Sequence, residues 1–515
     1  MQRPIRLVTA LALALLVALL AVGTLSAAPG DSSPGNKVSA KLRKAVDPAG
    51  ILVHERRLQR IANANEGNRG AGTSGYDASA DYVAGKLREA GYRVTEQPFE
   101  FPFFQEREPA ELEQVSPTAR PYETATFTYS GSGDVTGRIV PIGVQIPPSP
   151  TPGSTSGCEP EDFEPASATD PEVALIQRGT CTFGQKASNA QDAGYDAVVI
   201  FNEGQEGRQE LLTGTLGAPD FDIPVVGASF ADGQELYTAA QAGQTVVRVF
   251  ASTLSEVRIT TNVIADYPKG NANQTVVVGA HLDSVIEGAG INDNGSGTAQ
   301  NLEIALEMAK LNLRPANKVR FGFWGAEELG LLGSEHYVGS LNDAQLDRVA
   351  LNLNFDMTGS PNYVRFVYDG DGSETPDAGP AGSAQIENVF NRYFRAKGLE
   401  TDPTAFDGRS DYGPFIAQGI PAGGLFTGAE GVKTAEQAAI YGGTAAEPYD
   451  PCYHRACDDI TNLSVEALDE MSDAAAHATI NFAADETPFT GTTRAQKAKP
   501  AGATYKTFKG PEARK

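Results

Sequence analysis

Residues 275–284 read TVVVGAHLDS, an apolar run that passes directly into a histidine and an aspartate. The same design recurs twice: KVRFGFWG at residues 318–325 precedes a pair of glutamates, and LNLNF at residues 351–355 precedes an aspartate. Apolar runs that alternate with helical patterns predict an α/β sheet with helices on its faces. Polar side chains beyond the carboxyl ends of such strands converge on one crevice. The pattern therefore predicts one site, built from His281, Asp283, Glu327, Glu328 and Asp356.

Two further segments contribute side chains of the same kind. NDNGSG at residues 292–297 opens a long apolar helix and contains Asp293, and DPCYH at residues 450–454 ends in His454. Two histidines and several carboxylates without cysteine suit zinc or a similar divalent ion. A bridging carboxylate allows such a set to hold a pair of ions, as in co-catalytic hydrolases. The side chains of the two adjacent glutamates diverge, so one can bind metal while the other acts as general base.

Taken one at a time, these residues have ordinary structural explanations. A histidine at a strand end is more often hydrogen-bonded than metal-bound. A Glu-Glu pair suits the first turn of a helix, and Asp293 suits a glycine-rich turn. The whole set, found mostly at the ends of apolar strands, favours the metal site.

The motifs together resemble those of the M28 family of zinc aminopeptidases, most of all its secreted bacterial leucyl-type members. The resemblance rests on His281-x-Asp283, NDNGSG at 292–297, GAEE at 325–328, NFDM at 354–357 and Tyr453-His454. It extends to the N-terminal segment, with GNR at 67–69, Gly72-Thr73 and Gly75-Tyr76. Residues 125–250 resemble the protease-associated (PA) domain that many family members insert, with RGTCTF at 178–183 and AGYDA at 193–197.

The resemblance implies a role for each site residue. Two zinc ions per chain would be held by two outer ligand pairs and one bridging carboxylate: His281 with Asp356, Glu328 with His454, and Asp293 between them. Glu327 would be the general base. Asp283 would fix the tautomer of the His281 imidazole, and Tyr453 would donate a hydrogen bond to the tetrahedral oxyanion.

Substrate-binding residues follow from the same resemblance. In similar enzymes the free amine of the peptide meets the base, a metal-ligand carboxylate and the backbone carbonyl of an arginine, here Glu327, Asp356 and Arg409. Met357 and Phe426 would line an apolar pocket for the first side chain. Similar enzymes also carry a cis peptide bond directly after the bridging aspartate, so we expect the Asp293–Asn294 bond to be cis.

A secretory signal peptide is predicted at residues 1–28. Arg3 and Arg6 precede an apolar run that reaches Val22, and small residues follow it. A membrane anchor is the alternative, but a spanning helix needs about twenty apolar residues and usually has charged residues on its far side. We therefore expect a secreted protein without membrane association after cleavage.

Charge and cysteine content agree with that location. The net charge is −24, and it becomes −26 when Arg3 and Arg6 are removed with the signal peptide. Such an acidic surface repels nucleic acid and anionic membranes. Four cysteines in an exported chain suggest two disulfides. Because two cysteine pairs lie about 270 residues apart, Cys158–Cys181 and Cys452–Cys457 is the economical pairing; a cysteine metal site is the alternative, but the C-x-x-C spacing is missing.

Changes in composition and periodicity along the sequence divide the chain into segments. Residues 29–37 are a polar linker, and residues 38–124 are assigned to the N-terminal part of the peptidase domain. Short alternating runs between Gly and Pro turns mark residues 125–250 as a compact, mostly β insert. Residues 251–485 alternate strand and helix and form the catalytic domain. Residues 486–515 are basic and poor in apolar side chains, and we expect them to be a disordered tail.

We therefore expect a mixed β-sheet flanked by helices, with an inserted PA domain. The expected function is that of a monomeric aminopeptidase that acts on peptides with a free N-terminus and prefers a large apolar first residue. A carboxypeptidase of the same family would need a cationic clamp, which we do not find, and glutaminyl cyclase relatives keep only one working zinc. Intact Glu327 and Tyr453 argue against an inactive binding module. Calcium activates similar enzymes, but the sequence places no calcium site.

Overall fold

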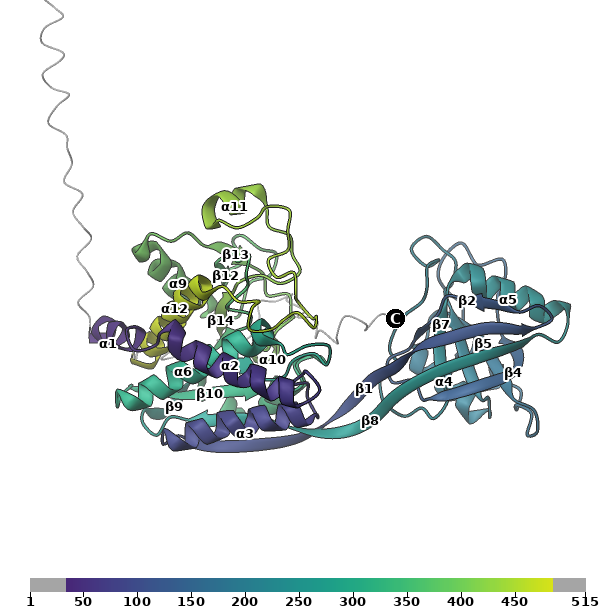
Figure 1. Cartoon of the computed structure of the whole chain (residues 1–515), viewed down its shortest axis with the longest axis horizontal. Coiled ribbons are helices and arrows are strands. Elements are labelled where there is room, and N and C mark those ends of the chain that lie inside the picture. Colours follow the sequence, from purple (N-terminus) through teal and green to yellow (C-terminus); the bar gives the residue numbers. More distant parts are fainter. Residues whose placement is uncertain (1–33, 485–515) are drawn as a thin grey trace, which may run out of the picture.

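Two lobes joined by a long antiparallel ribbon form residues 34–484, the part of the chain that the computed structural model describes (Figure 1). The predicted signal peptide at residues 1–28 and the predicted tail at residues 486–515 lie outside the described residues. Within residues 34–484, no helix has the length and apolar character needed to span a membrane.

The ribbon consists of β1 (Arg93–Ser116) and β8 (Val246–Asp266), which pair along their full lengths. Register shifts interrupt the pairing between Glu106 and Ser116, in the half that enters the smaller lobe. Such irregularities increase the local twist of a strand pair. Because both strands continue from one lobe into the other, a single sheet runs through the molecule.

The larger lobe is built on β9 (Asn271–His281), β10 (Asn317–Trp324), β11 (Val349–Phe355), β12 (Phe366–Tyr368), β13 (Asp402–Thr404) and β14 (Ala422–Phe426). The strand order is β13-β12-β14-β11-β9-β10-β8. At its centre β14, β11, β9 and β10 are parallel, whereas β12 and β8 run antiparallel to their neighbours β14 and β10. The mixed sheet predicted from the sequence is confirmed.

Helices cover both faces of this sheet. One face carries α1 (Pro34–Arg43), α2 (Pro48–Ala64), α3 (Ser74–Glu89), α6 (Gly297–Lys310), α9 (Ser383–Lys397) and α12 (Val465–Ala484). The other carries α7 (Leu332–Gly339), α8 (Asp343–Leu346) and α10 (Tyr412–Ala417), and α11 (Ala435–Tyr441) lies in the loop after β14. In β9, Val276 and Val278 pack in the core of the first face and Val277 in that of the second. An uninterrupted apolar run is the pattern of a strand buried on both faces.

The smaller lobe continues the sheet with β2 (Arg120–Tyr122), β3 (Ala125–Thr126), β4 (Gly133–Ile142), β5 (Glu172–Gln177), β6 (Ala197–Phe201) and β7 (Val225–Ala228). Strands β4 to β7 are parallel. The predicted insert was mostly β, and the structure shows two helices in it as well. Helix α5 (Phe230–Ala242) packs on one face of the sheet, and α4 (Phe183–Asp192) packs on the other. The short helical turn η1 (Pro160–Asp162) precedes β5. Because helices cover both faces, β5 and β6 are buried throughout rather than alternating.

Two predicted boundaries differ from the structure. The linker predicted at residues 29–37 overlaps α1, which begins at Pro34; Val38 and Leu42, one helical turn apart, pack against the core of the larger lobe. Leu112 and Tyr122 were assigned to the peptidase part, but they pack in the core of the smaller lobe. The reason is the ribbon, which carries one chain segment across both lobes.

Both predicted disulfides are present. Cys158–Cys181 lies in the smaller lobe with a Cα–Cα distance of 5.8 Å, and Cys452–Cys457 lies in the larger lobe with a distance of 5.3 Å.

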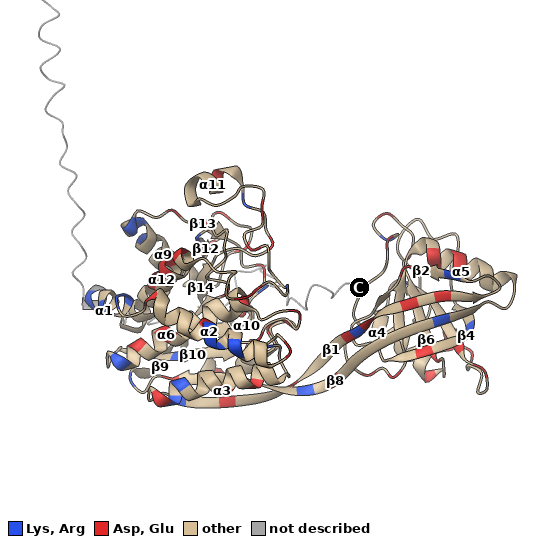
Figure 2. Ribbon diagram, viewed as in Figure 1, with Lys and Arg blue, Asp and Glu red and all other residues tan. Residues whose placement is uncertain are grey.

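Charged side chains of both signs are interspersed along the helices and the ribbon (Figure 2). Arg248 of β8, for example, pairs with Glu111 of β1 and with Asp134 at 2.6 Å. Exposed ion pairs of this kind contribute about 0–1 kcal/mol each. Each lobe therefore depends mainly on its own apolar core, and the β1–β8 strand pairing joins the two lobes.

Candidate metal centre

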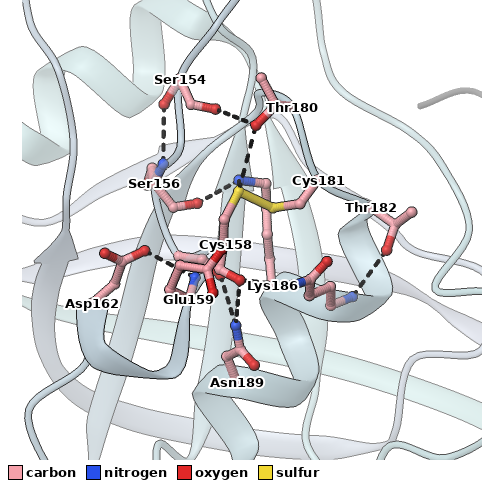
Figure 3. Close-up of a disulfide and its surroundings, with 12 residues drawn as sticks. Ser154, Ser156, Cys158, Glu159, Asp162, Thr180, Cys181, Thr182, Lys186 and Asn189 are labelled. Carbon is pink, nitrogen blue, oxygen red and sulfur yellow. Dashed lines mark hydrogen bonds between the residues drawn. A yellow bond between two sulfur atoms is a disulfide. The ribbon is translucent and has the colours of Figure 1, made fainter.

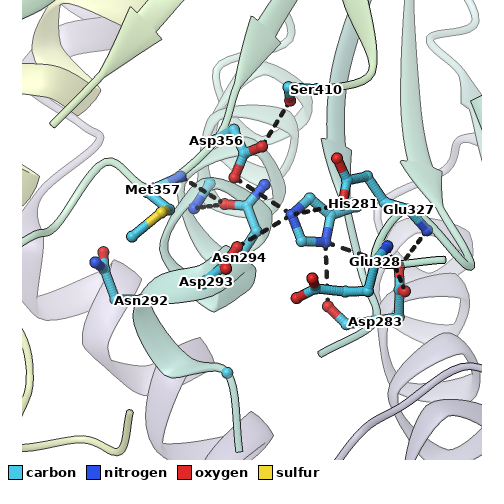
Figure 4. Close-up of polar contacts among 12 residues, drawn as sticks. His281, Asp283, Asn292, Asp293, Asn294, Glu327, Glu328, Asp356, Met357 and Ser410 are labelled. Atoms are coloured by element: carbon cyan, nitrogen blue, oxygen red, sulfur yellow. Dashed lines mark hydrogen bonds and ion pairs between the residues drawn. The ribbon is translucent and has the colours of Figure 1, made fainter. Parts of the chain in front are cut away.

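Three strand ends bring the predicted side chains together at one edge of the sheet (Figure 4). Strand β9 ends at His281, Glu327 and Glu328 follow β10, and Asp356 directly follows β11. Strand β9 lies between β10 and β11 and is parallel to both. The carboxyl ends of the three strands therefore open on the same crevice, where α/β sheets bind ligands.

Asp293 reaches this crevice from the turn before α6. The turn spans Ile291–Ser296, and the Asp293–Asn294 peptide bond is cis, as expected. The Asn294 side chain connects the turn to the end of β11. Its Nδ2 donates to the Phe355 carbonyl at 3.0 Å, and its Oδ1 accepts from the Met357 N–H at 3.2 Å. The turn and the residues after β11 thus hold each other in place.

The two carboxylate oxygens of Asp293 face two different imidazoles. Oδ1 lies 3.3 Å from His281 Nε2, and Oδ2 lies 3.2 Å from His454 Nε2. Each imidazole nitrogen has a second carboxylate neighbour. Asp356 Oδ1 is 3.3 Å from His281 Nε2, and Glu328 Oε2 is 3.0 Å from His454 Nε2. The five residues therefore form two donor groups that share Asp293.

The donor set fits a pair of divalent ions such as zinc. Ligands about 2.0–2.2 Å from a tetrahedral zinc ion lie roughly 3.3–3.6 Å from each other, close to the 3.0–3.3 Å separations within each group. Imidazole nitrogens and carboxylate oxygens without thiolate are typical of catalytic zinc sites. Several carboxylates buried together without cations would be costly. The chemistry of the donors therefore suits divalent cations such as zinc.

Burial and mutual repulsion shift the pKa values of these groups. Burial raises the pKa of Glu327 well above its usual value, although His281 pulls it down. Burial and the charge of Asp293 raise the pKa of Glu328 to about 7. Burial opposes a charge on the two histidines, but the surrounding carboxylates raise both pKa values, that of His454 to about 11. The crevice therefore concentrates negative charge that bound cations would neutralise.

Asp283 connects the residues on two sides of the crevice. Its carboxylate oxygens accept hydrogen bonds from the backbone N–H groups of Glu327 (3.2 Å) and Glu328 (3.3 Å). Its backbone carbonyl lies 3.2 Å from His281 Nδ1, closer than its own carboxylate oxygen at 3.7 Å. Donation from Nδ1 to Asp283 leaves Nε2 of His281 free to bind an ion. The contact predicted from the sequence thus involves the main chain of Asp283 as well as its side chain.

The loop that carries Tyr453 and His454 borders the same crevice. The rings of these two residues stack with their centroids 3.8 Å apart. Arg409 Nη2 donates to the Tyr453 hydroxyl oxygen at 3.3 Å, and Arg409 Nη1 pairs with Glu430 at 2.8 Å. Because the hydroxyl accepts from Arg409, its own proton is available for a different acceptor.

A pocket of about 520 Å³ has the donor groups in its wall. The predicted site residues that line it are His281, Asp293, Glu327, Glu328, Asp356, Met357, Arg409, Phe426, Tyr453 and His454. Asp283 is fully buried beside it and reaches it only through its neighbours. The structure therefore brings all the predicted metal, catalytic and substrate-binding residues to one place.

Several residues of the wall were missed by the sequence analysis: Tyr368, Thr404, Ala405, Asp407, Ser410 and Ala429. Ser410 is the most informative, because its Oγ donates to Asp356 Oδ2 at 2.6 Å and accepts from Asn354 Nδ2 at 2.8 Å. Apart from Asp407, these residues are of types that seldom bind metal. Tyr368 and Thr404 end the short strands β12 and β13, and the other four lie outside strands and helices. Only the position of Ser410 next to Arg409 could have indicated its role.

Two buried residues from distant segments support the crevice. Arg69, completely buried, donates to the carbonyls of Leu282, Ala289 and Gly290. Asp458 accepts from the backbone N–H of Asp293 at 3.0 Å. Arg69 belongs to the GNR motif at residues 67–69, which was the available signal; nothing in the sequence around Asp458 indicated its contact.

A second acidic group lies outside the crevice and consists of Asp369, Asp371 and Glu387. The carboxylate of Asp369 already accepts N–H groups from the following turn, including those of Glu374 at 2.8 Å and Thr375 at 2.7 Å. Its oxygens are therefore used within the turn, and we do not assign a calcium ion to this group.

Comparison with known proteins identifies the family. A profile of peptidase family M28 matches residues 262–479, and a PA domain profile matches residues 125–236. An aminopeptidase of Pseudomonas aeruginosa is 46% identical over 444 residues, which cover 85% of this chain and 81% of that protein. The chain belongs to peptidase family M28.

Other relatives of this M28 peptidase are also named aminopeptidases. A probable lipoprotein aminopeptidase of Mycobacterium tuberculosis is 41% identical, over 92% of this chain and 94% of that protein. The solved aminopeptidase from Aneurinibacillus sp. strain AM-1 has a TM-score of 0.60 at 27% identity, covering 85% of this chain and 95% of its own. A zinc aminopeptidase from Bacillus subtilis has a TM-score of 0.54 at 26% identity, covering 84% and 94%.

These comparisons bear on the predictions from the sequence. The predicted M28 membership, the inserted PA domain and the mixed α/β fold are confirmed. The aminopeptidase activity expected from the sequence is the one named for all four relatives described above.

Proposed function

We propose that this M28 peptidase is a secreted zinc aminopeptidase that removes single residues from the free N-terminus of peptides. The observation that carries the proposal is the position of Asp293, whose two oxygens face the imidazoles of His281 and His454. Asp356 and Glu328 complete the two donor groups beside an open pocket. The zinc named for the Bacillus subtilis relative agrees with this donor set.

Each protein group then has a defined task in peptide hydrolysis. Two bound zinc ions would lower the pKa of a water toward neutrality and polarise the scissile carbonyl. Glu327, whose Oε2 lies 3.9 Å from His281 Nε2, takes a proton from that water and later returns it to the leaving amine. Tyr453 donates a hydrogen bond to the oxyanion, an interaction worth about 3 kcal/mol.

The pocket selects the substrate by its first residue. We assign recognition of the free amine to the carboxylates of Glu327 and Asp356 and to the backbone carbonyl of Arg409. Met357 and Phe426 supply an apolar surface for the first side chain in the same pocket. This arrangement favours peptides with a large apolar N-terminal residue and an unblocked amine.

The proposed location of the protein is inferred from its sequence. The signal peptide predicted at residues 1–28 and the acidic composition support secretion. Action as a monomer and the bounds of the insert at residues 125–250 stay predictions.

A panel of amino acid p-nitroanilides tests the function directly. We expect hydrolysis of the leucine, methionine and phenylalanine derivatives, and a loss of at least a hundredfold when the leucine amine is acetylated, because buried carboxylates then lose their cationic partner. A chelator should abolish hydrolysis, and added zinc should restore it.

Two further substrates separate the alternative activities in the same assay. A peptide blocked at its N-terminus but free at its C-terminus reports a carboxypeptidase, and cyclisation of an N-terminal glutamine reports a cyclase. Hydrolysis of the acetylated and free leucine substrates at equal rates would refute the assignment of an amine-recognising exopeptidase.

A further inference from the structure

A buried lysine lies beside the disulfide of the smaller lobe (Figure 3). Lys186 of α4 has no exposed surface, and its ammonium donates to the carbonyl of Ser156. Its Nζ lies 3.7 Å from the Sγ atom of Cys158. A cation is therefore held in contact with one sulfur of the Cys158–Cys181 bridge.

No carboxylate among residues 34–484 forms an ion pair with this ammonium. The negative charges that act on the pKa of Lys186 are those of Glu203 and Asp162. Glu203 is paired with Arg208 at 2.7 Å, and Asp162 accepts the backbone N–H of Glu159 at 3.1 Å. Burial lowers the pKa of Lys186 to about 8, so most molecules carry the charge at pH 7. A buried cation without its own anion favours any negative charge that forms beside it.

The two sulfurs of the bridge differ in access. Cys158 is 4% exposed and is enclosed by Lys186 and by Thr180, whose hydroxyl oxygen lies 3.8 Å from Cys158 Sγ. Cys181 is partly exposed. Cys181 is therefore more accessible to a dissolved thiol than Cys158 is.

We propose that Cys181 is a thiolation site, at which a low-molecular-weight thiolate attacks Cys181 Sγ and releases Cys158 as a thiolate paired with the Lys186 ammonium. The bond between the two cysteine sulfurs breaks, and a bond forms between the incoming sulfur and Cys181. The electron pair of the broken bond goes to Cys158, so the exchange needs no other oxidant or reductant.

The lysine determines the direction and the rate of this exchange. A neighbouring cation lowers the pKa of a cysteine thiol. A leaving thiol of lower pKa leaves faster in thiol–disulfide exchange. The Lys186 ammonium contacts the Cys158 sulfur, so it favours departure of Cys158 and retention of the incoming thiol on Cys181. The site lies in the smaller lobe, and the inference does not depend on the proposed peptidase function.

The first test identifies the modified cysteine in the unaltered full-length protein. The protein is incubated with reduced glutathione at pH 7, free thiols are alkylated, and the peptides are mapped by mass spectrometry. We expect glutathione on Cys181 and the alkyl group on Cys158. Glutathione on Cys158, or equal amounts on both cysteines, would overturn the proposal.

The second test measures the exchange rate in Lys186→Met, which keeps an unbranched chain but removes the charge. We expect the rate at Cys181 to fall at least about tenfold, because the leaving thiolate loses its cation. Gln185→Met is the matched control: Gln185 contacts the Cys158 carbonyl at 2.8 Å but not its sulfur, so its rate should not change. The Cys452–Cys457 bridge in the same digests serves as internal reference. Equal rates in the Lys186→Met and unaltered proteins would refute the role of the lysine.

Discussion

Replacement of Glu327 by glutamine should lower kcat on leucine p-nitroanilide by about a thousandfold or more, while both zinc ions stay bound. The amide keeps the size of the side chain, and the backbone N–H of residue 327 still donates to Asp283. It cannot accept the proton of the attacking water, and general-base catalysis contributes roughly 10²–10⁴ in rate. The measurement is kcat together with the zinc content of the purified variant.

Glu328→Gln is the matched control for this experiment. Glu328 Oε2 lies 3.0 Å from His454 Nε2 and belongs to one donor group. Its amide variant should lose zinc and recover part of its activity at high zinc concentration, which Glu327→Gln should not. Equal loss of zinc from both variants would mean that the base and the ligand are assigned the wrong way round.

Asp293→Asn should cost about a thousandfold in activity and reduce the bound zinc from two ions to one. An amide offers one oxygen and one N–H₂ group, so it cannot present an anionic oxygen to both sides. Lewis-acid stabilisation by a bound ion is worth several kcal/mol, and each 1.36 kcal/mol is tenfold in rate. Elemental analysis and the p-nitroanilide assay measure the two effects in one preparation.

Asp407→Asn controls for a loss of charge in the same pocket. Asp407 lines the wall, but its contacts are the Tyr412 hydroxyl at 2.8 Å and the Arg409 N–H at 3.1 Å, not the histidines. We expect it to keep two zinc ions. An Asp293→Asn protein that binds two ions as tightly as the unaltered protein would contradict the bridging role.

The position of the site could be predicted because it depends on sheet geometry. His281, Glu327 and Asp356 each follow an apolar run, and parallel strands end at one edge. Sheet geometry alone could not predict that Asp293 and His454 belong to the site, since neither follows a strand. They were included because their residue types complete a donor set. The cis bond after Asp293 was expected from the resemblance to known enzymes.

The ribbon of β1 and β8, which runs from one lobe into the other, could not be predicted from local patterns. Strand residues alternate in the same way whether a strand stays in one lobe or crosses to another, so nothing near Leu112 indicated that it packs in the smaller lobe. Supporting contacts were missed for a related reason. Arg69 and Asp458 lie far along the chain from the turn that they hold, and pairing over such separations leaves no periodic signal.

The most direct test of the account is a zinc titration of the metal-free protein, with bound zinc and leucine p-nitroanilide hydrolysis measured in the same samples. Two donor groups that share Asp293 predict that activity reaches its maximum only when two ions are bound per chain. Full activity with a single tightly bound ion would contradict the two-ion centre.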